Sequence, residues 1–485
     1  MTRDVPCGIA RPEPDRKPTL LIMLRHGMSA RILFRSDFLK FVDAAGVRIV
    51  AACPAADEPY LRDELSQSDV ELVNLPEIKK GLVERAWSGV TNTLAWGHPG
   101  VTRTVTIKWL DRGVREGDYL SLLAGSLSSM LFLHKSRKFR RFLEWVDSRA
   151  FSHPEFGRLI DVCKPDAVLT TYSFEPDTAL IREARKRNIP ALAMVKSWDN
   201  LTSKTRISVE PDRLLVWSPY MKREAMQYHF VPEHNIPVVG APGFDDHFRN
   251  KDYGERAQYL AELGADPEAK LILYSPGVSF TISDEENLRL IHEVLTEQDF
   301  EFAWHVHIRK LPKVQLDLSA VEAELGMTSE MSGRVVETWA DKFDPGREDI
   351  DSLGRAVHHA DLLVHLGSTI AIDAACHDTP SIGYGLDATK SGVHHTHVAR
   401  HTFDLVHNRM LGEIGATKIV HTRGELIDAV RTYLSAPETD RSARATLVDR
   451  VIWKRDGRSG ERLAREVLTA MPITHSHGEE AGSGT

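Results

Sequence analysis

Two short stretches of this 485-residue chain hold residue types that bind phosphates and move protons. In the first, Gly367-Ser368-Thr369 separates the apolar run Asp361–Leu366 from the helical pattern Ile370–Cys376. A glycine turn between a buried strand and a helix leaves N–H groups unpaired at the helix N-terminus, where a phosphate can bind. Asp373, one helical turn further on, would reach a ribose hydroxyl. The alternative is an ordinary strand–helix connection in which Ser368 only caps the helix.

The second stretch is the loop Lys196–Lys204, which follows the apolar run Pro190–Val195. Its Asp199 is the first candidate for a base that takes a proton from an acceptor hydroxyl. His26, in the turn after the first apolar run, is the second candidate. Parallel strands of a doubly wound sheet end at one edge, so both turns are expected at the ligand-binding edge. The alternatives are a loop-capping role for Asp199 and a solvent-exposed turn position for His26.

Further polar residues stand near strand ends in the second half of the chain. We expect Gly277, His307 and Arg309 to line the pocket for a donor molecule. His305 is interpreted as a core residue that alternates with His307 along its strand. The cluster His394, His395, His397 and His401 is a metal site or a plain surface loop, and we predict no metal because it has no acidic or cysteine partner nearby.

The elements that must position these residues alternate between apolar runs and helical patterns, twice along the chain. In the first half, strands are predicted at Thr19–Leu24, Val47–Cys53, Val70–Leu75, Asp166–Tyr172, Pro190–Val195, Asp212–Trp217 and Ile236–Gly240. In the second half, they are predicted at Leu271–Ser275, Phe302–Ile308, Val335–Thr338, Asp361–Leu366, Pro380–Gly383 and Thr417–His421. Long helices are predicted at Ser29–Ala45, Tyr119–Val146 and Leu447–Met471. The pattern is typical of two doubly wound α/β lobes with a cleft between them.

Composition and missing motifs exclude several classes of function. The net charge of −8 argues against a general nucleic-acid binder. Neither the G-x-G-x-x-G nor the G-x-x-x-x-G-K-[ST] fingerprint occurs, which argues against a dinucleotide oxidoreductase and a P-loop enzyme. Four scattered cysteines, no signal peptide and no apolar run of transmembrane length predict a cytoplasmic protein with reduced thiols.

One basic segment stands out against the negative net charge. Lys135, Arg137, Lys138, Arg140 and Arg141 are interleaved with Phe139, Phe142 and Trp145. A basic amphipathic helix can lie on an anionic membrane surface or hold an anionic polymer, which would place the protein at the inner face of a membrane. The alternative is a solvated helix face that packs on the first lobe.

Several segments together resemble the GT-B fold of bacterial surface-carbohydrate glycosyltransferases. They are KSWDN (196–200), PDRLLVWSPYMKREA (211–225), VVGAPGFD (238–245), ADLLVHLGSTIAIDAACHDTPSIGYG (360–385) and WKRDGRSGERLAREVL (453–468). The resemblance covers most of residues 19–471 except the excursion at 81–156. It implies two Rossmann-like lobes facing a central cleft, a nucleotide-sugar donor as substrate, and neither a cofactor nor a bound metal.

The implied organisation divides the chain at about residue 250. The parts are a flexible N-terminal tail (1–17), an acceptor lobe (18–249) with a helical insertion (about 81–156), a nucleotide-donor lobe (250–450), a crossover helix back to the first lobe (451–472) and a disordered tail (473–485). Asp245-Asp246 is interpreted as hinge or capping material.

The loop at 198–204 also resembles the W-H-G-T-P-x-K loop of the CDP-glycerol glycerophosphotransferases. Trp198 and Lys204 match that pattern, whereas Asp199 replaces the histidine that is the family's presumed base. The family's second-lobe H-P motif is matched only by His307-Ile308, without the proline. These departures favour sugar transfer over glycerophosphate transfer.

The resemblance therefore predicts a metal-independent GT-B glycosyltransferase of surface or capsular polysaccharide synthesis, acting on a glycan or lipid-linked acceptor. Asp199 or His26 would be the base, and Gly27, Trp198 and Lys204 would contact the acceptor. Gly277, His307, Arg309, Gly367, Ser368, Thr369 and Asp373 would bind the donor. The alternatives are a CDP-glycerol-type glycerophosphotransferase, a sugar-nucleotide epimerase, and a non-catalytic scaffold that binds nucleotide-sugars.

Overall fold

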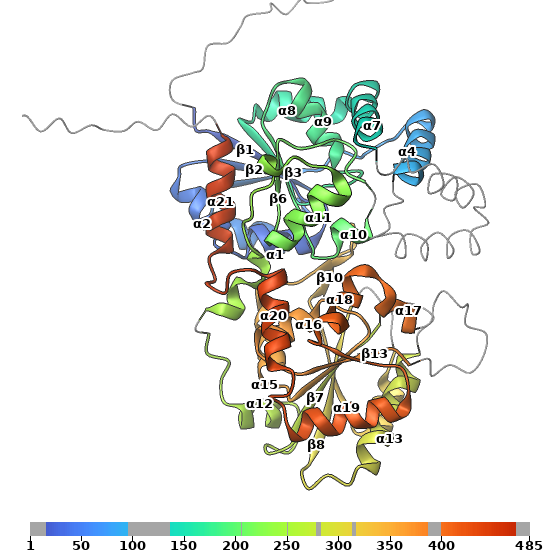
Figure 1. The fold of residues 1–485 in the computed structure, drawn as a ribbon. Helices are drawn as coiled ribbons and strands as arrows, with labels where there is room; N and C mark the ends of the chain where they lie inside the picture. The colour runs from blue at the N-terminus through green and yellow to red at the C-terminus, as the bar shows by residue number, and fades with distance from the viewer. Residues whose placement is uncertain are drawn as a thin grey trace, which may run out of the picture.

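The computed structural model describes residues 16–95, 136–204, 206–249, 251–277, 283–312, 317–386 and 399–471. These residues form two α/β lobes, which lie one above the other in Figure 1. Residues 1–15 of the tail predicted at 1–17, the tail predicted at 473–485, the first part of the helix predicted at Tyr119–Val146, and His394, His395 and His397 lie outside the described residues. The side chain of His401 is not described either.

The first lobe is built on a parallel sheet with the strand order β3-β2-β1-β4-β5-β6. This is the order of a doubly wound Rossmann sheet. Most of its side chains are buried on both faces, which is why the strands read as continuous apolar runs. The strands are β1 Thr19–Met23, β2 Arg48–Cys53, β3 Val70–Asn74, β4 Ala167–Thr170, β5 Ala191–Met194 and β6 Arg213–Leu215.

The second lobe repeats this architecture in the order β14-β13-β12-β7-β8-β9. Counted along the chain within the lobe, the order is again that of a Rossmann sheet. The strands are β7 Lys270–Ser275, β8 Trp304–Lys310, β9 Thr328–Met331, β12 Leu362–His365, β13 Ser381–Tyr384 and β14 Lys418–Val420. Two six-stranded parallel sheets with helices between their strands confirm the predicted two-lobe α/β fold.

Helices connect the strands within each lobe. The first lobe has α1 Gly27–Leu33, α2 Phe38–Ala44, α3 Pro59–Leu65, α4 Leu82–Ala95, α7 Arg137–Ala150, α8 Pro154–Cys163, α9 Thr178–Lys186, α10 Asn200–Ser203, α11 Pro219–His229 and the 3₁₀ turn η2 Glu233–Asn235. The 3₁₀ segment η3 Pro242–Phe248 leads out of it. The second lobe and the return contain α12 Arg256–Glu262, α13 Asp284–Glu297, α14 Ser319–Leu325, α15 Arg347–His359, α16 Ile370–Cys376, α17 Ala399–Asp404, α18 Val406–Ile414, α19 Arg423–Ser435, α20 Arg441–Val451 and α21 Ser459–Ala470.

Two predicted helices and one predicted strand are wrong in detail. The helix predicted at Ser29–Ala45 is two helices, because the Ser36 hydroxyl donates to the Ile32 carbonyl at 2.6 Å and accepts the Phe38 N–H at 3.3 Å. The final helix is also two, α20 and α21, separated by a segment with Trp453 and Gly457 at positive φ. The strand predicted at Ile236–Gly240 is reduced to a single bridge between Val216 and Val238.

The last helix, α21, returns to the first lobe and lies beside α2 (Figure 1). Its N-terminus is capped from another segment, since the Asp245 carboxylate accepts the N–H groups of Ser459 at 3.0 Å and Gly460 at 2.8 Å. Asp245 therefore has the capping role that the sequence indicated. A Cβ on Gly460 would lie 2.9 Å from the Phe38 backbone nitrogen, so the close approach of the two helices requires glycine there.

A segment of the second half of the chain docks on the first lobe. We call residues 334–345 the docking hairpin, which contains β10 Arg334–Val335 and β11 Phe343–Asp344. The buried Arg35 guanidinium binds the Asp344 carboxylate of the hairpin and, on its other side, the Glu64 carboxylate at 2.7 Å. Burial alone would lower the pKa of Arg35, but the two carboxylates raise it. The strand predicted at Val335–Thr338 thus belongs to neither main sheet.

None of the described helices is both long and apolar enough to cross a membrane. Cys53, Cys163 and Cys376 are free thiols, and Cys7 lies outside the described residues.

The docking hairpin makes Gly27 a sensitive position. A Cβ on Gly27 would lie 2.0 Å from the Phe343 carbonyl oxygen, a backbone atom that cannot move aside independently. We expect Gly27→Ala to destabilise the protein by about 1–3 kcal/mol, the usual cost of overpacking. Denaturant unfolding measures this change. Gly424→Ala is the matched control, because nothing lies within 4 Å of the added Cβ, and equal stability of the two variants would contradict the close approach of Phe343 to Gly27.

Candidate active site

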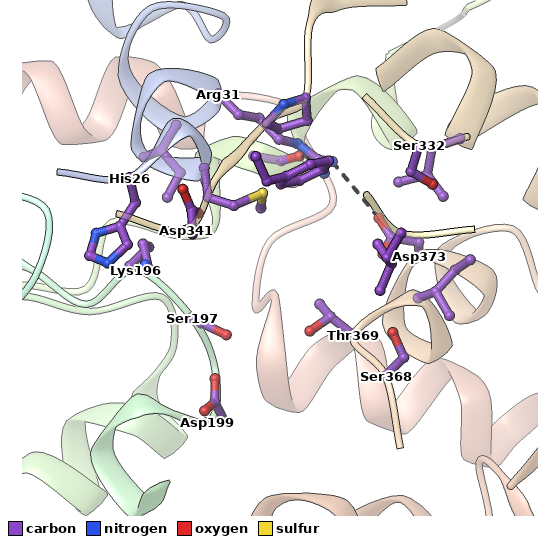
Figure 2. Close-up of a pocket in the computed structure, with 18 of the residues that line it drawn as sticks. His26, Arg31, Lys196, Ser197, Asp199, Ser332, Asp341, Ser368, Thr369 and Asp373 are labelled. Carbon is purple, nitrogen blue, oxygen red and sulfur yellow. Dashed lines mark hydrogen bonds and ion pairs between the residues drawn. The ribbon is translucent and has the colours of Figure 1, made fainter. Parts of the chain in front are cut away.

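A cavity of about 480 Å³ lies between the lobes, where strands of both sheets end. His26 follows β1 and Asp199 follows β5, whereas Ser368 follows β12. Figure 2 shows Lys196, Ser197 and Asp199 on one side and Ser368, Thr369 and Asp373 on the other. The structure therefore brings together turns that are far apart in the chain, as the switch-point rule predicts.

Asp199 stands at the entrance to the short helix α10 and lines the cavity. Its carboxylate accepts hydrogen bonds from the Ser203 hydroxyl and, at 3.2 Å, from the Asn200 side-chain amide. Burial alone would raise the pKa of Asp199, but the charges of His407 and Lys204 and the hydroxyl hydrogen bonds lower it to about 2. The side chain is therefore an anion at neutral pH and a weak base in this arrangement.

His26 also lines the cavity, on the same side as Lys196 in Figure 2 and at the position that precedes α1. Its ring lies 5.5 Å from that of Tyr172, and the Lys196 ammonium lies 5.3 Å from the same tyrosine ring. The neighbouring Gly27 is not among the described residues that line the cavity, and its N–H donates to the Asp341 carboxylate of the docking hairpin at 3.0 Å. Gly27 therefore helps to hold the hairpin.

Trp198 does not line the cavity. It is buried, and its indole N–H donates to the Thr369 hydroxyl at 3.4 Å across the interlobe boundary. Its ring also packs edge-on against His407 of α18. Trp198 therefore joins the lobes, whereas Lys204 from the same loop lines the cavity.

The backbone amides of the Gly367-Ser368-Thr369 turn, which were predicted to bind a phosphate, contact a side chain of the protein. The N–H groups of Gly367 and Ser368 donate to Nδ1 of the buried His365, at 3.1 and 3.3 Å. These two amides already have an acceptor inside the protein, so they do not point at a phosphate in this conformation. The side chains of Ser368 and Thr369 line the cavity, and Gly367 has a φ of 76°, which favours glycine.

Asp373 lines the cavity, but its carboxylate is engaged. It accepts a hydrogen bond from His247 Nε2 at 2.9 Å, and Arg31 lies 3.9 Å away, which is the dashed line of Figure 2. Burial alone would raise the pKa of Asp373, but His247 and Arg31 lower it. His247 contacts His377 at 2.9 Å, and His377 contacts the exposed His358 at 3.3 Å, so a chain of three histidines runs from Asp373 to the surface.

The remaining predicted donor residues do not converge on the cavity, except Arg309. His305 and His307 are two residues apart and so lie on the same face of β8, where both contact the Thr328 hydroxyl. Their assignment to opposite faces was wrong, and His307 does not line the cavity. Gly277 does not line it either, and its N–H donates to Asp284 at 3.1 Å. Arg309 lines the cavity while pairing with Glu330 and Asp349.

The cavity-lining residues that the sequence did not single out include Arg31, Lys196 and Asp341. Arg31 has a weak signal, since a cation on an otherwise apolar helix face must find a polar partner. Asp341 has none, because the docking of its hairpin depends on contacts far away in the chain. Among the described residues, no group of three histidine, cysteine or acidic side chains is arranged to hold a metal ion.

The comparison with protein families decides where this chain belongs. The model of the CDP-glycerol:poly(glycerophosphate) glycerophosphotransferase family matches residues 190–469, more than half of the chain. The chain belongs to this family. The match begins just before β5 and spans the cavity-lining loops of both lobes from Lys196 onward. A search among curated protein sequences gave no significant match.

Solved structures similar to this glycerophosphotransferase-family protein share its two-lobed architecture. The UDP-GlcNAc 2-epimerase of Neisseria meningitidis, bound to UDP-GlcNAc, aligns with a TM-score of 0.52 at 11% identity, covering 94% of this chain and 100% of the epimerase. The epimerase of Methanocaldococcus jannaschii gives 0.50 at 14% identity, with 94% and 100% coverage. A glycosyltransferase of Rickettsia africae aligns with a TM-score of 0.48 at 12% identity, covering 93% of this chain and 99% of that glycosyltransferase. At such identities the likeness to the two epimerases shows the fold alone, which is the predicted GT-B fold, and the family match indicates a transferase.

The turn that carries Ser368 should be sensitive to acid. Burial lowers the pKa of His365 to about 3, against about 6.5 in an unfolded chain. The His365 ring must be neutral because its Nδ1 accepts two N–H groups. The stabilisation that this ring gives to the folded protein is therefore complete above pH 6.5 and is lost as the pH falls towards 3. We expect the free energy of unfolding to fall by about 2 kcal/mol between pH 7 and pH 5 because of this histidine alone.

Unfolding of variants at the two pH values checks this expectation. His365→Asn keeps an acceptor near the Nδ1 position but does not titrate, so its loss of stability on acidification should be smaller than that of the natural protein. The exposed His234, changed to asparagine, is the control for the loss of a surface histidine. An unchanged slope for His365→Asn would show that His365 is not held neutral.

Proposed function

We propose that this glycerophosphotransferase-family protein transfers a sugar from a nucleotide-sugar donor to an acceptor hydroxyl, without a bound metal, in the synthesis of a surface or capsular polysaccharide. The observation that carries the proposal is Asp199, which lines the interlobe cavity where the family pattern has its presumed histidine base. Trp198 and Lys204 match the W-H-G-T-P-x-K pattern of the family. The loop is therefore kept, while an aspartate replaces the histidine as the candidate base. The likeness in fold to an epimerase that holds UDP-GlcNAc supports a nucleotide-sugar ligand.

Each wall of the cavity would serve one substrate. The donor nucleotide lies against the second lobe, with its phosphates near the hydroxyls of Ser368 and Thr369 and its ribose near Asp373. The acceptor enters from the first lobe beside Lys204. Cations that face the cavity, Lys196 and Arg31 among them, would stabilise the departing nucleotide diphosphate by the electrostatic effect on which metal-free transfer depends.

Asp199 and His26 are the two candidates for the base that removes the acceptor proton. The contacts of Asp199 make it the weaker of the two. A carboxylate with a pKa of about 2 gains little by taking a hydroxyl proton, so Asp199 becomes a strong base only if its pairing with Lys204 and His407 is relaxed. A histidine imidazole can also take the proton of a hydroxyl, and His26 lines the same cavity. In that case Asp199 orients the acceptor or Lys204 instead.

The two candidates are separated by paired substitutions. Asp199→Asn and His26→Gln each remove a basic atom and keep the shape of the side chain. We expect the variant that lacks the true base to lose roughly 10²–10⁴-fold in turnover with little change in donor affinity. Turnover is measured with the donor that stabilises the protein, and donor affinity by calorimetry. If both variants turn over at the natural rate, neither residue is the base.

The placement of the donor is tested through Asp373. Asp373→Asn removes a charge-assisted hydrogen bond to the ribose and should weaken nucleotide binding by about 1–3 kcal/mol. Because Asp373 also holds His247, the control is His247→Gln, which disturbs the same contact and leaves the carboxylate in place. Calorimetry with nucleoside diphosphate should show a larger loss for Asp373→Asn. Equal losses would assign Asp373 to the interlobe contact alone.

The family match favours a second candidate, transfer of glycerophosphate from CDP-glycerol. Thermal unfolding with CDP-glycerol and with UDP-, GDP-, CDP- and ADP-sugars compares the two, since a ligand that binds the native state raises its stability. Stabilisation by CDP-glycerol alone would replace sugar transfer. Conversion of a nucleotide-sugar without an acceptor would identify an epimerase. If neither CDP-glycerol nor any nucleotide-sugar stabilises the protein, the remaining alternative is a non-catalytic scaffold.

A further inference from the structure

A second pocket, of about 210 Å³, lies in the first lobe outside the cleft. It is bounded by the first turns of α7, the segment around Arg206 and the end of α11. Four arginines line it: Arg137, Arg140, Arg141 and Arg206. The volume far exceeds the about 10–15 Å³ that one water molecule needs, so a small polyatomic ligand fits.

Arg206 is the most deeply buried of the four, at 2% exposure. It pairs with the Asp147 carboxylate and donates to the Thr91 hydroxyl at 2.9 Å. Among the described residues no acceptor lies within hydrogen-bond distance of its Nε. A buried guanidinium N–H without an acceptor is unfavourable, so an acceptor supplied by a ligand would stabilise this side chain.

Arg140 differs in burial from the other described cations of the basic segment. Arg137, Lys138 and Arg141 are exposed, whereas Arg140 is turned into the pocket, where it donates to the Tyr228 carbonyl at 3.2 Å. Burial and then the charge of Arg206 lower the pKa of Arg140 to about 9. The two buried guanidinium groups therefore repel each other, and an anion bound between them would relieve the repulsion.

Two carboxylates, Glu144 and Glu210, also line the pocket, but both have other partners. Glu144 pairs with Arg185 at 3.1 Å, and Glu210 accepts the Asn235 side-chain amide at 3.2 Å. Burial and then the Glu144 charge raise the pKa of Glu210, so the two acids lie close together on one side. Because Asp147 already pairs with Arg206, the other three arginines stand against the two lining carboxylates, and the pocket remains positive.

We propose that this pocket binds a phosphate group, as a phosphate ion, a monoester or a diester. Guanidinium forks match phosphate oxygens in geometry as well as in charge, and Arg137 and Arg141 at the exposed end would guide the group inward. The pocket lies directly behind the loop of Asp199, because His229 in its wall donates to the Leu201 carbonyl of α10 at 2.9 Å. The assignment is independent of which donor the cleft takes.

The test titrates the full-length protein with inorganic phosphate and follows binding by calorimetry and phosphorus NMR. Arg140→Gln and Arg141→Gln should each weaken binding at this site by about tenfold or more, as expected when one charge-assisted contact is lost. The exposed Arg149→Gln, on the same helix but outside the pocket, is the matched control and should bind as the natural protein does. Lys204→Gln identifies phosphate that binds in the cleft instead. Arg141 is exposed, so its variant answers the question even if Arg140→Gln fails to fold.

Vesicles of phosphatidylglycerol, with phosphatidylcholine vesicles as reference, distinguish the source of the phosphate group. Binding to phosphatidylglycerol vesicles that is lost in Arg140→Gln and Arg141→Gln assigns the pocket to a lipid headgroup. Loss of soluble phosphate binding alone in these variants assigns it to a soluble phosphate or phosphodiester. If both variants bind phosphate and vesicles like the natural protein, or if only Lys204→Gln loses phosphate, the pocket is not a phosphate site.

Discussion

The position of the cleft depends on one buried charge, the guanidinium of Arg35. Its partners come from both halves of the chain, since Glu64 belongs to the first lobe and Asp344 to the docking hairpin. A buried cation is tolerated only when it is paired, and removing one partner from such a group costs about 3–5 kcal/mol. The same hairpin carries Asp341 to the cavity wall and buries Trp339 against Tyr60, so the interlobe geometry follows from this pairing.

The acids of the cavity all have partners within the protein, which makes the cleft a balanced set of charges. Asp373 is held by His247 and Arg31, Asp349 by Arg309, and Asp341 by the N–H of Gly27. Two of these contacts, Arg31 with Asp373 and the Gly27 N–H with Asp341, join the first lobe to segments of the second half of the chain.

The sequence predicted the strands and the strand-end turns well because that information is local. A strand buried on both faces is a continuous apolar run, and parallel strands end at one edge, so His26, Asp199 and Ser368 could be placed near the cleft without a structure. The boundaries of α16 agree with the prediction for the same reason. The docking hairpin, the capping of α21 by Asp245 and the use of the Gly367 and Ser368 amides by His365 depend on distant partners, which no local pattern contains. The assignment of His305 and His307 to opposite faces of β8 was an error of another kind. Side chains alternate along a strand with a period of two, so the sequence alone should have placed both on one face.

The crossing of α21 to the first lobe means that this lobe is not a continuous piece of the chain. Leu463 and Val467 of α21 belong to the same hydrophobic core as β1, and so does Trp339 of the docking hairpin. Synthesis proceeds from the N-terminus, and domains generally fold as units when their sequence has emerged from the ribosome. Here the first sheet emerges early, but the apolar surface that α21 covers stays open until α21 itself has been added. The second lobe is thus enclosed in the folding of the first, and a polypeptide truncated shortly before residue 459 would lose part of the core of the lobe that was made first.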